Sequence, residues 1–130
     1  MPLADVRFEH EDAIVIAALT GEVDMSNAAS VRQQIAESTT PDDDAVVVDL
    51  SELAFMDSAG LHSLVELGTV LEERRQQLLL CVPGGSPMQR AIEIIGLPSA
   101  VSVHSSRDEA IDAARASAME SRPIGPTENA

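Results

Sequence analysis

The chain has 130 residues and a formal net charge of −14, and its length suits one domain. Its eight basic residues are all arginine, and this acidic balance argues against nucleic acid or an anionic membrane as the main partner, because both bind a basic face. An acidic chain is better suited to a basic protein surface. Aromatic residues make up 2% of the chain, so aliphatic side chains must form the core.

Cysteine content and hydropathy indicate a cytoplasmic protein. Cys81 is the single cysteine, which excludes an intrachain disulfide and fits a reducing compartment. The first residues show no charged segment followed by an apolar run, so no signal peptide is expected. The apolar stretches fall short of the roughly 20 residues that are needed to span a membrane.

Hydrophobic patterning in the first part of the chain predicts a hairpin, a helix and a buried strand. Residues 6–9 and 13–19 are expected to be strands, with Asp12 in the acidic turn between them. A helix over residues 26–37 has one apolar face. Residues 45–50 form a continuous apolar run, which is typical of a strand covered on both faces.

The second part of the chain continues the alternation. A short crossing leads from the apolar run to the Asp57-Ser58 pair, where a helix is expected to begin, and helical periodicity runs over residues 60–77. Ser86-Pro87 opens the next helix with a cap and a first-turn proline, and that helix is expected to turn Ala91, Ile92 and Ile95 inward. The remaining expected elements are strands over residues 78–82 and 101–104, and a final helix that begins with a capping box over residues 106–109.

This order of elements predicts the α/β class, with a mixed central sheet of about five strands, parallel crossovers and four helices packed on the sheet. One domain is expected over residues 1–116. Residues 117–130 turn polar and include Pro123, Gly125 and Pro126, so they are expected to form a disordered tail.

Three segments together resemble a known family. They are Gly21-Glu22-Val23-Asp24, Val46-Val47-Val48-Asp49-Leu50-Ser51 and Phe55-Met56-Asp57-Ser58-Ala59-Gly60-Leu61. In this order and spacing they resemble the STAS domain family, and most of all the bacterial anti-sigma factor antagonists. The resemblance runs over about residues 6–116.

The resemblance implies a protein-binding switch. In that family a partner anti-sigma factor, a kinase of the histidine-kinase-like ATPase fold, phosphorylates the serine that Ser58 matches. The unphosphorylated antagonist binds the anti-sigma factor and frees the sigma factor, and a separate phosphatase restores binding after phosphorylation. The implied partner-binding residues are Asp24, Asp57, Ser58, Ala59, Gly60 and His62. The interpretation includes no catalytic residue, metal, cofactor, nucleic acid or membrane, and it leaves the oligomeric state open.

The chemistry of a helix start supports Ser58 independently of the resemblance. The first amides of a helix lack internal partners and carry partial positive charge, so a phosphate there can accept their hydrogen bonds. Phosphorylation adds about −1.5 to −2 charges near neutral pH, and the adjacent Asp57 opposes part of that gain. The larger effect is expected on a docked partner, because a bulky dianion would be forced into a fitted interface.

Other interpretations stay open from the residues alone. Ser58 or Asp57 could be an N-cap and nothing more, and Asp24 either caps the helix that follows it or contacts the partner. A STAS scaffold of a signalling complex, or a subunit module of a lipid-transport system, would use the same surface without phosphorylation. An enzyme with Ser58 as nucleophile and His62 as base lacks an oriented third group.

Several remaining residues have simpler explanations. His10 and His104 are expected to be solvated or capping, and Cys81 to be a small buried residue. Met25, Met56 and Met88 are either surface contacts or core residues. Gln76-Gln77 stands where the family often has a glycine, so the helix before it must end in another way.

Overall fold

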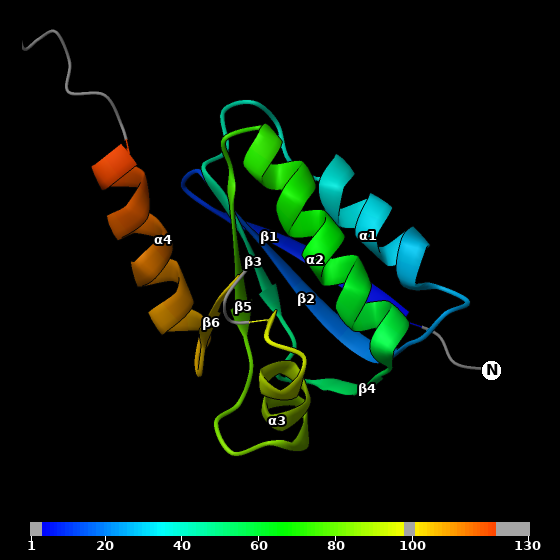
Figure 1. The fold of residues 1–130 in the computed structure, drawn as a ribbon. Coiled ribbons are helices and arrows are strands. Elements are labelled where there is room, and N and C mark those ends of the chain that lie inside the picture. Colours follow the sequence, from blue (N-terminus) through cyan, green and yellow to red (C-terminus); the bar gives the residue numbers. More distant parts are fainter. Residues whose placement is uncertain (1–3, 98–100, 122–130) are drawn as a thin grey trace, which may run out of the picture.

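The structure is a computed structural model that describes residues 4–97 and 101–121. Its elements are β1 (Ala4–Glu11), β2 (Ile14–Val23), α1 (Ala28–Glu37), β3 (Ala45–Asp49), β4 (Leu53–Met56), α2 (Ser58–Glu73), β5 (Gln77–Cys81), α3 (Pro87–Ile94), β6 (Ser102–His104) and α4 (Arg107–Ser121). Figure 1 shows their arrangement around a central sheet. The described residues confirm the predicted α/β class with a mixed sheet and four helices, and they add a sixth strand.

The sheet has the strand order β1-β2-β3-β5-β6, and β4 pairs with β2 outside this sequence. The β1–β2 pair is antiparallel and the other pairs are parallel. Asp12 lies in the hairpin turn with a φ of 55°, a conformation that aspartate tolerates better than most residues. β3 pairs with residues 14–18 of β2, and β4 pairs with residues 21–23. β4 therefore follows β3 along the same edge of β2 and carries the chain to α2.

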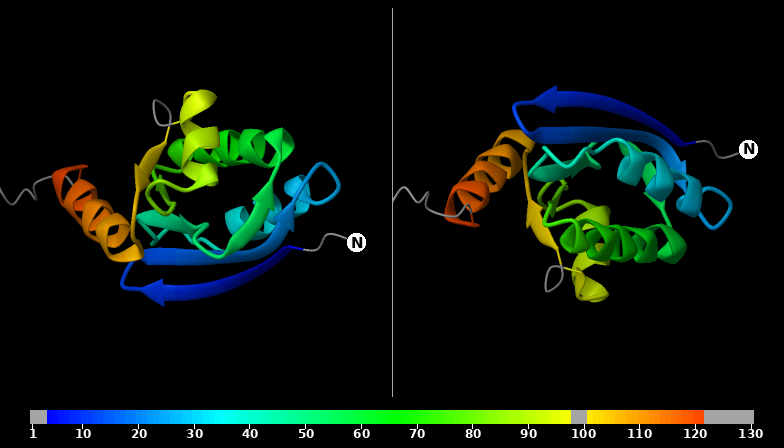
Figure 2. Two further views of the ribbon diagram at one scale, coloured as in Figure 1. Left: turned by 90° about the horizontal axis from the view of Figure 1, so that it is seen from below. Right: turned by 90° about the horizontal axis from the view of Figure 1, so that it is seen from above.

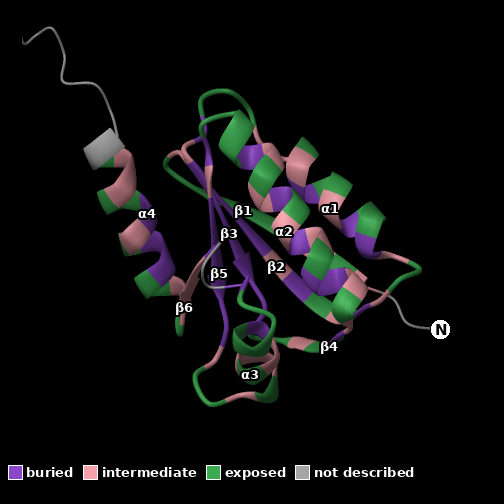
Figure 3. Cartoon of the chain, in the orientation of Figure 1, coloured by how far each residue is buried: buried purple, intermediate pink, exposed green. Residues whose placement is uncertain are grey.

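Helices cover both faces of the sheet, as Figure 2 shows from two sides. α1 and α2 pack against each other on one face, where Val46, Val48 and Leu80 belong to the larger core cluster. α4 packs on the opposite face, where Val47 and Leu79 belong to a second cluster. Successive residues of a strand point to opposite faces of the sheet. Because both faces are covered here, β3 is buried at every position (Figure 3). Burial on both faces explains the continuous apolar run.

β4 occupies the segment that the sequence predicts to be a short crossing. Two of its four residues, Ala54 and Phe55, are exposed, so the segment has no hydrophobic period long enough to indicate a strand. Its pairing with the end of β2 stabilises it instead. β1 and β2 also extend beyond the predicted ranges, because they pair with each other along the whole of β1.

The second helix begins at the Asp57-Ser58 pair, as the sequence predicts, but it ends at Glu73, so the predicted end at residue 77 is wrong. The chain leaves the helix through Arg75, whose φ of 61° lies in the region that glycine usually occupies. The Gln76 amide donates to the Leu71 carbonyl at 2.8 Å, and the Arg75 amide donates to the Glu72 carbonyl at 2.9 Å. This pairing is a Schellman motif, so the helix closes without the family glycine.

α3 begins as predicted but buries less than predicted. The Ser86 hydroxyl accepts a hydrogen bond from the Gln89 amide at 3.1 Å, and Pro87 occupies the first turn. Ile92 is buried, whereas Ile95 is 46% exposed, so the inward position predicted for Ile95 is wrong. The helix ends at Ile94, and Gly96, with a φ of 76°, redirects the chain just after Ile95.

α4 begins where the sequence predicts it, with the Glu109 amide donating to the Ser106 hydroxyl at 3.1 Å. Ala110, Ile111 and Ala114 are buried against the sheet. The helix continues to Ser121, so the first residues of the predicted tail, 117–121, are helical. Residues 122–130 lie outside the described part of the chain. No helix in the described ranges combines the length and the apolar character that crossing a membrane requires.

Candidate functional site

The pairing of β2 with β4 brings two acidic residues together. Val23 and Met56 are register partners on the parallel strands, and the Asp57 amide donates to the Val23 carbonyl at 3.1 Å. Asp24 and Asp57 are the next residues along each strand. They therefore lie side by side where the two strands end and α2 begins.

In the first turn of α2, one residue caps the helix and the next residue carries an accessible hydroxyl. Asp57 is the N-cap, with extended backbone (φ −90°, ψ −173°), and its Oδ1 accepts a hydrogen bond from the Gly60 amide at 3.1 Å. Ser58 is the first helical residue and is exposed. Within the described ranges its hydroxyl makes no hydrogen bond, so Ser58 is not the cap. Its hydroxyl is accessible at the positive end of a helix of 16 residues.

Gly60 belongs to the packing beneath the site and not to its surface. It is buried, and a Cβ at this position would lie 2.5 Å from the Met56 Cγ and 3.0 Å from a Val23 Cγ. α2 can therefore approach the ends of β2 and β4 closely only because residue 60 has no side chain. Gly60 therefore has a packing role in the fold, and its predicted contact with a partner stays a prediction.

Asp24 is held in a tight loop. Its Oδ1 accepts hydrogen bonds from the Ser26 amide at 2.8 Å and from the Ser26 hydroxyl at 2.5 Å. These bonds, the hydroxyl bond first, lower the pKa of Asp24 below its ordinary value. The N-cap of α1 is Asn27, so the capping role that the sequence allows for Asp24 is not taken by its side chain. The Asp24 backbone carbonyl instead receives the amides of Asn27 and Ala28.

The surroundings of Ser58 are acidic. Glu22, Asp24 and Asp57 lie at the end of β2 and at the start of α2, and none of them is buried. Among the described arginines none lies on these segments, and Arg32 of α1 pairs with Glu66, about two turns into α2. A phosphate on Ser58 would therefore find helix amides as partners and carboxylates as neighbours.

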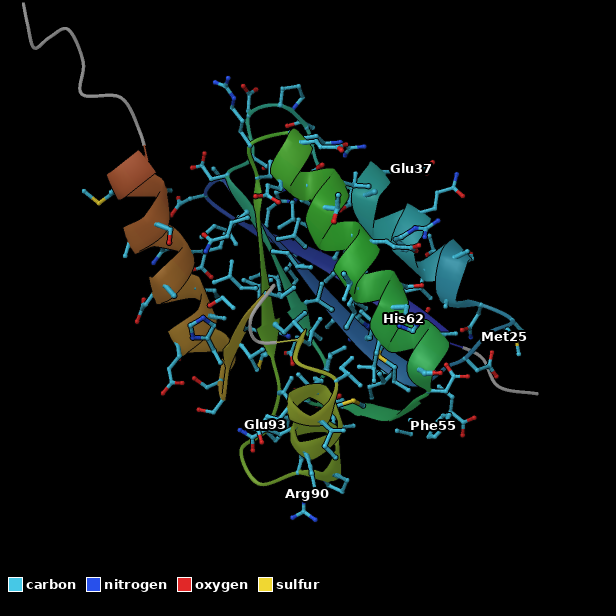
Figure 4. The ribbon with its side chains drawn as sticks, in the orientation of Figure 1. Met25, Glu37, Phe55, His62, Arg90 and Glu93 are labelled. Atoms are coloured by element: carbon cyan, nitrogen blue, oxygen red, sulfur yellow. The ribbon has the colours of Figure 1, made fainter. Side chains whose placement is uncertain are left out.

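The other predicted residues fall on the same corner of the molecule. Ala59 is half-buried against the core, whereas His62 is exposed one turn after Ser58 (Figure 4). No hydrogen bond joins His62 to Ser58 in the described structure, and no third group orients the ring. This geometry offers no nucleophile–base pair.

Two large apolar side chains also border the site. Met25, which the sequence leaves open between surface and core, is 83% exposed in the loop after β2. Phe55 is 49% exposed on β4, and the sequence gives no sign of it until the pairing of β4 with β2 is known. Figure 4 shows Met25, Phe55 and His62 around the start of α2.

Among the remaining candidates, Cys81 matches its simpler explanation as a small buried residue, whereas both histidines lie beside polar side chains. Cys81 is buried, and burial, followed by the charge of Asp49, raises the pKa of its thiol to about 12. His10 lies 3.8 Å from Asp43, and the His104 ring is hydrogen-bonded to Ser102. Across the described ranges, no group of three or more histidine, cysteine, aspartate or glutamate side chains could hold a metal ion.

Comparison with known proteins agrees with this geometry. The STAS domain model matches residues 5–110. BtrV of Bordetella bronchiseptica, named as an anti-sigma factor antagonist, is 32% identical over 100 residues, which cover 76% of this chain and 84% of that protein. The crystal structure of an anti-sigma factor antagonist from Mycobacterium paratuberculosis is 26% identical, with a TM-score of 0.74 over 87% of this chain and 95% of that one. The phosphorylated form of the Bacillus cell fate determinant SpoIIAA shares the fold, with 23% identity and a TM-score of 0.60 over 83% and 97% of the two chains.

A mixed sheet with helices on both faces, with an exposed serine at the start of α2, defines an α/β domain of the STAS type. The chain belongs to the STAS domain family. Relatives that match it over most of their length are anti-sigma factor antagonists.

Proposed function

We propose that this chain is a cytoplasmic anti-sigma factor antagonist whose binding is switched by phosphorylation of Ser58. The proposal is supported by the different roles of two neighbouring residues, Asp57 and Ser58, at the start of α2. Asp57 caps the helix, which leaves the Ser58 hydroxyl exposed and without a structural hydrogen bond. A hydroxyl that stabilises nothing in the fold can be modified without unfolding the domain.

The unphosphorylated surface is the binding form in this proposal. The anti-sigma factor docks over the start of α2 and contacts Asp24, Asp57, Ser58 and His62. While it is docked there, it cannot hold its sigma factor. The chain acts as a binding protein in this cycle and not as an enzyme.

Phosphorylation changes the charge of this surface more than the fold beneath it. The partner kinase transfers the γ-phosphoryl group of ATP to the Ser58 oxygen, which loses its proton, and ADP leaves. The phosphate brings about −1.5 to −2 charges to a surface that already holds Asp24 and Asp57. A tenfold loss of affinity requires about 1.4 kcal/mol, which steric conflict and charge repulsion at a fitted interface can supply. A phosphatase restores binding by hydrolysing the phosphate ester.

The direct test is phosphorylation with a defined partner. The chain is incubated with ATP and each anti-sigma factor kinase encoded in its own genome, and mass spectrometry locates the phosphate. We expect phosphate on Ser58 in the wild-type chain and in Ser30→Ala, a control at another exposed serine, and none in Ser58→Ala. Tight binding without modification of Ser58 would indicate a STAS scaffold without a switch, and an absence of binding would reject the antagonist function.

Affinity measurements test the switch itself. Ser58→Ala should bind the anti-sigma factor in the presence of ATP as tightly as the unphosphorylated wild-type chain does, because it cannot be modified. Ser58→Glu should bind at least tenfold more weakly, which corresponds to about 1.4 kcal/mol or more. Calorimetric titration of each variant gives the two dissociation constants, and equal values would contradict the mechanism.

A further inference from the structure

Met25 and Phe55 are exposed to an extent that the fold does not require. Their exposed fractions are 83% and 49%. Most large aliphatic side chains on the neighbouring strands are buried, including Leu19 and Val23 on β2. Exposed apolar side chains that gather at one place mark interaction surfaces more often than scattered ones do.

The backbone holds both side chains beside Ser58. Met56 is 8% exposed and faces the core, so the preceding residue, Phe55, points to the opposite face of β4. Met25 lies two residues after Val23, whose carbonyl accepts the amide of Asp57. The segments that carry Met25 and Phe55 are therefore joined directly to the N-cap of α2, and Figure 4 shows the two side chains on either side of that helix end.

The apolar surface continues past Phe55. A groove between β4 and α3 is lined by Phe55 on one side and by Pro87, Met88 and Ala91 on the other. On the side of Phe55 that faces β2 the surface is acidic, because the register partner of Phe55 is Glu22, which is exposed. The pattern is an apolar centre with an acidic rim, as in interfaces whose core excludes water and whose charged edge selects the partner.

We infer that Met25 and Phe55 are the apolar anchors by which the anti-sigma factor holds this chain, and that the partner presents an apolar pocket bordered by basic side chains. This inference rests on the proposed function and deepens it. Phenylalanine and methionine are enriched in interfaces, and a few such residues carry most of the binding energy. Glu22 and Asp24 supply the complementary charge for a basic border.

The anchors and the phosphorylated serine have separate roles. Met25 and Phe55 determine how strongly the partner is held in the unphosphorylated form, because they supply the apolar contacts of the docked state. Ser58 determines whether the partner can approach closely enough to use them. Loss of an anchor should therefore weaken binding in the unphosphorylated form, whereas loss of the Ser58 hydroxyl should leave that binding intact.

The chain contains matched controls for both anchors. Phe8 on β1 is 40% exposed, and Met119 on α4 is 76% exposed. Phe8 pairs with Ala17, six residues before Val23 on β2, which places it about 20 Å along the strand from the site. Met119 lies on α4, which packs against the opposite face of the sheet from α2.

The experiment measures the dissociation constant between the anti-sigma factor and Met25→Ala, Phe55→Ala, Phe8→Ala and Met119→Ala by calorimetric titration. Thermal unfolding of each variant verifies the fold. We expect each anchor variant to bind at least tenfold more weakly than the wild-type chain, and each control variant to remain within about threefold. The loss should appear mainly as faster dissociation, because steering charges are retained.

The outcomes distinguish this inference from the proposed function. Wild-type binding with phosphorylation of Ser58, combined with unchanged affinity of Met25→Ala and Phe55→Ala, would overturn the anchors alone. Equal losses in the anchor and control variants would also overturn them. If the wild-type chain bound no anti-sigma factor from its genome, the antagonist function and the anchors would both be rejected.

Discussion

Gly60 and Ser58 are two positions apart on α2, and they meet different needs of the same site. Ser58 must be accessible to a partner, and because Asp57 caps the helix, the Ser58 hydroxyl is left without a structural hydrogen bond. Residue 60 must be a glycine for close packing, because Met56 and Val23 occupy the space that a side chain would fill. The helix that carries Ser58 is thus held close to the ends of β2 and β4 by the absence of one methyl group.

Replacing Gly60 with alanine tests this close approach. The new Cβ would lie 2.5 Å from the Met56 Cγ, so the side chain of Met56 or the helix must move. Overpacking of this kind costs about 1–3 kcal/mol, of which the higher helix propensity of alanine offsets up to about 1 kcal/mol. We expect a net loss of roughly 1–2 kcal/mol in the free energy of unfolding, measured by urea titration.

Gly68 provides the matched control on the same helix. A Cβ there would make ordinary contacts of 3.6 Å with Leu78 and Val101. Gly68→Ala should therefore be neutral or should stabilise the domain by up to about 1 kcal/mol. Similar free energies for Gly60→Ala and Gly68→Ala would show that residue 60 does not limit how closely α2 packs.

At the scale of an element, the end of α2 stores a small strain. Arg75 adopts a φ of 61°, which costs an L-residue roughly 1–2 kcal/mol relative to glycine. The Schellman hydrogen bonds of Gln76 and Arg75 fix this conformation. We expect Arg75→Gly to raise the free energy of unfolding by about 0.5–1 kcal/mol. The gain is smaller than the strain that is relieved, because glycine also has more conformational freedom in the unfolded chain.

Arg74 is the natural control for that measurement. It has a φ of −93°, and its guanidinium donates to the Ala36 carbonyl at 2.8 Å and to the Thr39 hydroxyl at 3.2 Å. Arg74→Gly loses these contacts with the end of α1 and gains no relief of strain. It should destabilise the domain in the same urea titration, and stabilisation by both substitutions would contradict the role assigned to residue 75.

The elements differ in how much of them the sequence could predict. β3 follows from its continuous apolar run, because it is buried on both faces. The buried face of α1 follows from the helical spacing of its apolar residues. β4 does not, because pairing with β2 and not burial stabilises it. The same long-range pairing places Asp24 beside Asp57 and turns Phe55 outward. Local patterns and the family resemblance together pointed to Ser58, whose phosphorylation stays a prediction, but they could not outline the surface around it.

At the scale of the whole molecule, α4 is joined to the sheet by arginines as well as by its apolar face. Nε and Nη2 of Arg107 donate to one Asp49 carboxylate oxygen at 3.0 and 2.9 Å, and Nη1 reaches Glu9 at 3.3 Å. Arg115 donates to Glu11 and Asp12 in the hairpin turn. The Asp49 side chain is 9% exposed, whereas both partners of Arg115 are solvated, so the two pairs should differ in strength.

The Asp49–Arg107 pair should make the stability of the domain depend on pH. Burial raises the pKa of Asp49, but hydrogen bonds from Ser51 and Arg107 outweigh it, so the pKa lies below its ordinary value. A carboxyl whose pKa is lowered by folding stabilises the fold above its unfolded pKa of about 3.9 and loses that contribution as pH falls through the folded value. Arg107→Gln should cost about 2 kcal/mol at pH 7, and this difference from wild type should shrink as pH falls below about 4 and through the lower pKa of folded Asp49. Arg115→Gln should cost under about 1 kcal/mol, because its partners are exposed. Urea titrations of the three proteins between about pH 3 and 7 measure these differences, and an Arg107→Gln deficit that stayed constant with pH would show that the ion pair does not hold α4 to the sheet.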